Sequence, residues 1–118
     1  MTSMAENVTA FRALSAIVNG GINHKSVAVR TEVARLMDMI VIQLGSIRVF
    51  GSSREFLEVL FPNGAKLLTD GSIEVRTHAK HMFGELIRHD KFESAIKEYL
   101  RENERRDIKK TIDSLYSK

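Results

Sequence analysis

The fold of this chain can be inferred from one stretch, PNGAKLLTDGSIEVR, which runs from Pro62 to Arg76. Its first half ends in the apolar pair Leu67-Leu68, and a new apolar spacing begins at Val75. Between them, Asp70-Gly71-Ser72 is a tight break of the kind that marks a turn. Two helices joined by so short a link pack side by side and antiparallel, so the stretch predicts a helical hairpin.

The second helix of this hairpin has a copy earlier in the chain. Residues 72–77, SIEVRT, align with residues 26–31, SVAVRT, at an offset of about 46 residues, which is typical of repeats built from helix pairs. Further along, apolar positions stay in phase: Val33 with Ala79, Leu36 with Met82, Met37 with Phe83, and Ile40 with Leu86. Chance would seldom keep these positions in phase as well as repeating Val-Arg-Thr. The chain is therefore expected to repeat a helical hairpin.

Outside the repeat, apolar residues recur at helical spacing along the whole chain and predict six helices. Gly20-Gly21 is expected to end the first helix and Gly45 to cap the second, with Val49-Phe50 in the linker that follows. Ser52 and Glu55 have the spacing of a capping box at the start of the third helix. The residues expected at the centre of the core are Phe11, Val29, Leu36, Ile40, Leu60, Leu68, Val75, Phe83 and Leu86.

The composition is typical of a globular protein, with 43% hydrophobic and 28% charged residues. Cysteine is absent, which excludes disulfides and thiolate metal sites. We expect no membrane segment and no secretory signal, and hence a cytoplasmic location. The net charge of +3 suits an acidic partner. Without a catalytic signature or a phosphate-binding loop, the chain is expected to be a binding module rather than an enzyme, with no cofactor and no small-molecule substrate.

The stretch from Pro62 to Arg76, followed by Ala79, Phe83, Gly84 and Leu86, resembles the HEAT-repeat pattern without a gap. In that pattern a proline bends the first helix, an aspartate caps the second, and an arginine reaches a partner in the turn. Asp70 and Arg76 occupy the last two positions, and Arg30 is the equivalent arginine in the first copy. The resemblance implies an all-α fold, an α-solenoid of about three antiparallel helix pairs in a HEAT/armadillo-like superhelix. One domain over residues 1–118 is expected, with repeats at about 4–46, 52–89 and 91–117.

A narrower resemblance is to the TOG domains, which are HEAT arrays that bind tubulin. It is closest to the crescerin type, found in TOG-array regulators of axonemal microtubules, and wider relatives are the CLASP-like microtubule regulators. It rests on residues 21–30, on the unit at 62–86, and on Arg88-His89-Asp90-Lys91-Phe92 before the charged last hairpin. Because about three repeats fit in this chain, the resemblance covers the C-terminal half of a TOG domain. It implies a cytoskeletal or ciliary protein whose partner is αβ-tubulin or the microtubule.

In TOG domains the turns inside successive repeats form the tubulin-binding edge. By position, these turns are residues 19–25, 69–72 and 101–104. The resemblance therefore implies these partner-binding residues: Asn23, His24, Lys25, Ser72, Arg101 and Arg105. A basic residue such as Lys25 could pair with the acidic surface of tubulin, and the alternative is that Lys25 is only a solvated surface lysine. Asp70 and Glu74 make the second turn acidic, where such a surface prefers basic residues.

Two other functions are open. A generic HEAT scaffold would hold a helix or peptide of another protein in a groove between hairpins, and changes on helix faces rather than in turns would then disrupt binding. Weak nucleic-acid binding would use four basic residues near the C-terminus, namely Arg105, Arg106, Lys109 and Lys110. Acidic residues alternate with them and no aromatic platform is interleaved, so nucleic acid is not the expected partner.

A metal site is not expected. His78, His81 and Glu85 fall on neighbouring turns of one helix but lack the spacing that brings two imidazoles to one metal. His81 and Glu85 are instead expected to form an exposed pair one helical turn apart.

Overall fold

The computed structural model describes residues 2–116, with side chains from Thr9 onward, and every regular element in that range is an α-helix. The predicted all-α fold is therefore confirmed. The helices are α1 (Thr2–Gly21), α2 (Val27–Phe50), α3 (Arg54–Leu68), α4 (Ile73–Leu86), α5 (Phe92–Tyr99) and α6 (Glu102–Tyr116). The predicted end of the third repeat at residue 117 lies outside the described residues. No described helix is long and apolar enough to cross a membrane.

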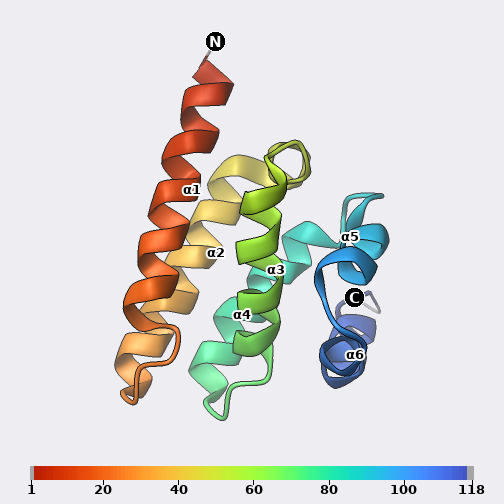
Figure 1. Ribbon diagram of the computed structural model, residues 1–118. Helices are drawn as coiled ribbons and strands as arrows, with labels where there is room; N and C mark the ends of the chain where they lie inside the picture. The colour runs from red at the N-terminus through yellow and green to blue at the C-terminus, as the bar shows by residue number, and fades with distance from the viewer. Residues whose placement is uncertain (1, 117–118) are drawn as a thin grey trace.

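The first four helices form two layers. In Figure 1, α1 and α3 lie in front of α2 and α4, and each front helix packs on the helix that follows it in the chain. Behind them, α2 runs alongside α4 in the most extensive contact between two helices. The last two helices cover the far side of α3, and α6 is seen nearly end-on, so the last hairpin turns away from the direction of the first two. This arrangement is compatible with the expected α-solenoid.

Phe61 in α3 lies at the centre of the core. Its ring centroid is 6.0 Å from that of Phe50, 6.2 Å from Phe83, 6.1 Å from Phe92 and 5.9 Å from Tyr99. These partners come from α2, α4 and α5, so a single side chain joins α3 to three other helices. Aromatic rings at these separations gain from edge and offset contacts as well as from burial.

The predicted core is confirmed around the central hairpin and wrong in the first one. As predicted, buried positions include Leu60, Leu68, Val75, Phe83 and Leu86. Only half-buried, by contrast, are Phe11, Val29, Leu36 and Ile40. The buried face of α2 is formed instead by Val33, Ala34, Met37 and Val41. Helix α2 packs along α4 more extensively than along α1, and its buried face turns toward α4.

Helix α2 is interrupted at Gly45, although helical turns resume beyond it as far as Phe50. Gly45 has φ 80° and ψ 156°, a conformation that is essentially confined to glycine. The expectation of a break at Gly45 is confirmed, but the expected linker is wrong because Val49 and Phe50 lie in a helical turn. Both are buried, and the Phe50 ring stacks on His89 at 4.7 Å.

Two polar side chains of α4 form hydrogen bonds to the interrupted helix α2. At the break, the Ser46 N–H donates to Glu85 Oε2 at 3.0 Å. His81 Nδ1 lies 2.9 Å from each carboxylate oxygen of Asp38. The expected pair between His81 and Glu85 is therefore wrong, because each residue instead joins α4 to α2. Within residues described by the structure, no group of three or more His, Cys, Asp or Glu could hold a metal ion.

The helix ends follow the sequence signals with one shift. Helix α1 ends at Gly21 as predicted. Helix α3 begins after Ser53, whose Oγ accepts a hydrogen bond from the Phe56 N–H at 3.3 Å. The capping box expected at Ser52 is therefore one residue too early, and the Ser52 hydroxyl instead donates to the Arg48 carbonyl at 2.8 Å.

Candidate partner-binding edge at the turns

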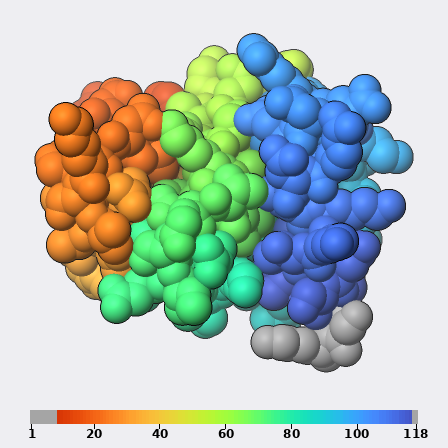
Figure 2. Space-filling model, turned by 90° about the horizontal axis from the view of Figure 1, so that it is seen from below, coloured from red at the N-terminus to blue at the C-terminus, as the bar shows by residue number. Residues whose placement is uncertain are grey.

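The turns of the first two hairpins lie side by side at one end of the molecule. The first, at residues 22–26, joins α1 to α2, and the second, at residues 69–72, joins α3 to α4. Both are at the lower end of the ribbon in Figure 1, and Figure 2 shows that end face-on, with α6 running along the same face. We refer to these two turns, together with the first helical residues Val27 and Ile73, as the turn edge.

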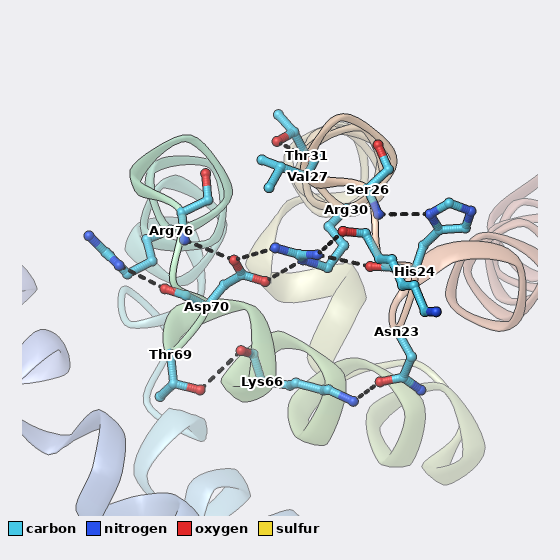
Figure 3. A network of polar contacts seen from close by, with 12 residues as sticks. Asn23, His24, Ser26, Val27, Arg30, Thr31, Lys66, Thr69, Asp70 and Arg76 are labelled. Atoms are coloured by element: carbon cyan, nitrogen blue, oxygen red, sulfur yellow. Dashed lines mark hydrogen bonds and ion pairs between the residues drawn. The ribbon is translucent and has the colours of Figure 1, made fainter.

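Arg30 links the two turns (Figure 3). Its Nε donates to Asp70 Oδ2 at 2.8 Å and its Nη2 to Asp70 Oδ1 at 3.3 Å, a bidentate contact between the first and second hairpins. Its Nη1 donates to the carbonyl oxygens of His24 at 2.9 Å and Lys25 at 3.1 Å. One guanidinium thus donates to two carbonyl groups of the first turn and to the carboxylate of the second turn. These contacts fix the two turns relative to each other.

The two turns are built in the same way, which is the structural form of the sequence repeat. Arg76 Nη1 donates to the Asp70 carbonyl at 2.7 Å, as Arg30 does to the carbonyl of His24 in the first turn. His24 Nδ1 accepts from the Ser26 N–H at 3.0 Å, and Asp70 Oδ1 accepts from the Ser72 N–H at 2.9 Å. The prediction that Arg76 reaches an acidic or carbonyl partner in the turn is confirmed, and the partner is the Asp70 carbonyl. Asp70 does not cap the free N–H groups of α4 as expected, because it bonds the N-cap residue itself and Arg30.

Asp70 is held in its ionised form by these contacts. Burial works to raise the pKa of the Asp70 carboxyl, but hydrogen bonds from Arg30 and the Ser72 N–H, with the charges of Arg30 and Arg76, lower that pKa below its ordinary value of 3.8. The Asp70 side chain is only 11% exposed, so its charge is neutralised within the protein rather than displayed. Glu74 remains as the exposed acidic residue near the second turn.

The turn edge displays one basic and two apolar side chains. The Lys25 side chain is exposed and has no hydrogen-bond or ion-pair partner among residues whose side chains are described. Val27 is 44% exposed and Ile73 is 70% exposed, and they are equivalent residues of the two repeats. Asn23 accepts a hydrogen bond from Lys66 Nζ of α3, so this side chain is already engaged. Exposed aliphatic groups on a well-fixed backbone are what a protein partner can cover with little ordering cost.

The structure brings four of the predicted site residues together and leaves two apart. Asn23, His24, Lys25 and Ser72 all belong to the turn edge. Arg101 lies between α5 and α6, where its N–H donates to Glu104 Oε1 at 2.9 Å, and the half-buried Arg105 follows in the first turn of α6.

The surface of α6 that faces the second turn is acidic. A hollow there has Lys66 and Thr69 on one side and Glu104 and Asp107 on the other. The basic residues of α6 are divided between its two flanks, with Lys110 toward α4 and a group toward α5 that comprises Arg105, Arg106 and Lys109. They form no single basic track of the kind that follows a phosphate backbone.

The sequence carries a signal for Val27 and Ile73, which lie outside the predicted site residues. Both occupy the position after the N-cap serine in the repeated motif, where a helix that faces solvent usually has a polar residue. Apolar residues at both equivalent positions give the turn edge exposed aliphatic surface.

The arrangement is an all-α one over the described residues, in which the first two helical hairpins hold their turns along one fixed edge. The chain is similar to TOG array regulator of axonemal microtubules protein 1 from Mus musculus, with 28% identity over 115 residues. The match covers 98% of this chain and confirms the resemblance to the TOG-array regulators, but this chain spans only 6% of the length of that protein. No family model and no solved structure matches the chain.

Proposed function

We propose that this chain is a tubulin- or microtubule-binding module of the TOG type, and that it binds through the turn edge. The observation that carries the proposal is the bidentate contact of Arg30 with Asp70, which joins two successive turns into one fixed surface. The similarity to a protein named as a regulator of axonemal microtubules supports the same partner. The proposed role is binding without catalysis, in a cytoskeletal protein of the cytoplasm or cilium.

The mechanism is the presentation of a preformed surface. Lys25 would approach acidic groups of tubulin, while Val27 and Ile73 would be covered by the partner. Because Arg30 already orders the backbone of both turns, binding would not carry the entropic cost of ordering them. The charge of Lys25 would contribute mainly to association and to partner choice, so binding should weaken as salt rises.

Two substitutions at the turn edge test this proposal. Lys25→Glu and Ile73→Asp should each weaken binding to αβ-tubulin, or to assembled microtubules, by about tenfold or more, since loss of an interface hot spot costs about 2 kcal/mol or more. Aspartate is favourable in the first turn of a helix, so Ile73→Asp should not unfold α4. Binding is measured by gel filtration with tubulin and by co-sedimentation with microtubules, at low and moderate salt.

The matched control is Lys97→Glu, which makes the same charge change on an exposed residue of α5, away from the turn edge. It should bind as the wild type does. Equal losses for Lys97→Glu and Lys25→Glu would mean that overall charge alone governs binding. Full binding by both turn-edge variants would exclude this edge as the tubulin contact.

A further inference from the structure

A second surface, separate from the turn edge, lies between α4 and α6. It is a groove of about 710 Å³, open to solvent, with part of α2 at one side. The residues that matter for its chemistry are Ile42, Lys80, Gly84, Arg88, Lys110 and Leu115. Ile42 is 43% exposed and Leu115 is half-buried, so the groove offers apolar surface as well as charge.

Gly84 is the unusual residue of the groove. It lies inside α4, where glycine is less favourable than alanine because it loses more conformational freedom on folding. Its backbone shows no positive φ, and a Cβ added there would meet nothing within 4 Å. By contrast, a Cβ at Gly64 would lie 2.9 Å from Met82 Cε and from Phe83 Cε2. Nothing within the described chain therefore requires glycine at position 84, whereas a helix that lies down on α4 would approach most closely there.

The charges that the groove presents outward are positive. Lys80 and Lys110 line opposite walls, on α4 and α6, and Arg88 lies two turns after Lys80 with its side chain 73% exposed. The acidic residue of the groove, Glu85, has both oxygens engaged, by the Ser46 N–H at 3.0 Å and by Arg88 Nη1 at 3.3 Å. His81 is engaged by Asp38. An occupant would therefore meet basic side chains from both α4 and α6, together with apolar surface from Ile42 and Leu115.

We infer that this groove docks an amphipathic helix from an acidic protein partner. Its apolar face would lie over Ile42, Gly84 and Leu115, and its flanking carboxylates would pair with Lys80 and Arg88 on one side and Lys110 on the other. A helix suits the site because the described elements around it are all helices, and the missing side chain at Gly84 permits close approach of a second helix. Arg88 lies just past the end of α4 at Leu86, about two helical turns after Lys80, which matches acidic residues two turns apart on the partner.

The test uses a fluorescein-labelled synthetic peptide about 18 residues long, or about five helical turns, with a leucine stripe flanked by glutamates two turns apart. Its control has lysines in place of the glutamates. We expect saturable binding of the glutamate peptide by fluorescence anisotropy and at least about tenfold weaker binding of the lysine peptide. Gly84→Leu should fill the groove and weaken binding of the glutamate peptide at least about tenfold. The double variant Lys80→Glu with Lys110→Glu should weaken binding of the same peptide by a similar factor.

Controls separate this groove from the turn edge and from damage to the fold. Gly84→Leu should unfold at the same temperature as the wild type or higher, because leucine is the better helix former and a Cβ at this position meets nothing within 4 Å. Ala16→Leu, on the exposed side of α1, should leave peptide binding unchanged. Lys25→Glu should weaken binding to tubulin and leave binding of the peptide unchanged. Gly84→Leu should weaken binding of the peptide and leave binding to tubulin unchanged. Absence of saturable peptide binding, or binding that Gly84→Leu leaves intact, would overturn the inference.

Discussion

Replacement of Phe61 by alanine is expected to lower the free energy of unfolding by about 3–5 kcal/mol, the largest effect of any single truncation in this chain. Phe61 is fully buried and its ring contacts rings from α2, α4 and α5. Removal of the ring leaves a cavity, because the surrounding helices cannot all move inward to fill the space. Urea unfolding followed by circular dichroism gives the change, because the fold is entirely helical over the described residues.

Phe11→Ala is the matched control for this prediction. Phe11 is also a phenylalanine and contacts Phe56 at 6.5 Å, but it is only half-buried, in the first hairpin. Its truncation should cost clearly less than that of Phe61, since less apolar area returns to water. A larger loss for Phe11→Ala than for Phe61→Ala would contradict the assignment of the core to the junction of α2, α3, α4 and α5.

Loss of the contact between Arg30 and Asp70 is expected to have the second-largest effect. Arg30→Ala and Asp70→Asn should each lower the free energy of unfolding by about 1–3 kcal/mol, because each leaves a partly buried charged or polar partner without its hydrogen bonds. The two side chains are 20% and 11% exposed. The double variant should lose less than the sum of the two, which is the signature of a direct interaction.

The control for this pair is Arg35→Ala, which breaks an exposed pair with Glu32 on the same helix. Such pairs contribute at most about 1 kcal/mol, so this change should be small. Additive losses for Arg30→Ala and Asp70→Asn would show that the two residues do not act together in solution.

The contact between Arg30 and Asp70 also predicts that the free energy of unfolding depends on pH in the acid range. The pKa of Asp70 is lowered in the folded protein, so the unfolded chain binds its proton more readily. The stabilisation is therefore present above the ordinary pKa of 3.8 and is lost as the pH falls through the lower folded value. Asp70→Asn should be less stable than the wild type at pH 7, and the difference should shrink as the pH falls below about 4.

The sequence predicted those features that depend on local spacing. The repeated SVAVRT and SIEVRT motifs located α2 and α4, and the arginine of each motif reaches a carbonyl in its own turn. The glycines at 21 and 45 marked a helix end and a break. These signals are carried by a few neighbouring residues, so a single sequence is sufficient to detect them.

Contacts between hairpins could not be predicted in the same way. Asp38 and His81 are far apart in sequence, and only the packing of α2 on α4 brings them together. Local spacing instead favoured a pair between His81 and Glu85, and it gave no reason to expect that Glu85 would bond the Ser46 N–H. The link from Arg30 to Asp70 was missed for the same reason, since each residue had a satisfactory local role within its own repeat.

The proposed binding site was predicted only in part. Position in the repeat located the turns and singled out Lys25. It could not show that the Asn23 side chain is already engaged by a hydrogen bond from Lys66. Arg101 and Arg105 do not join the turn edge because the last hairpin turns away from the direction of the first two, and α6 instead directs Glu104 and Asp107 toward the second turn. The orientation of one hairpin on another depends on side-chain packing across the whole interface, which the periodicity of one helix does not determine.

The most direct test of the proposed function is hydrogen exchange of the chain with and without αβ-tubulin, followed by mass spectrometry. The first N–H groups of a helix lack intrahelical partners, so the starts of α2 and α4 should exchange quickly in the free chain. We predict that tubulin slows exchange in residues 22–30 and 69–76 and leaves the α4 and α6 groove at residues 80–88 and 110–115 unchanged. Protection confined to the groove, or no protection anywhere at saturating tubulin, would contradict binding through the turn edge.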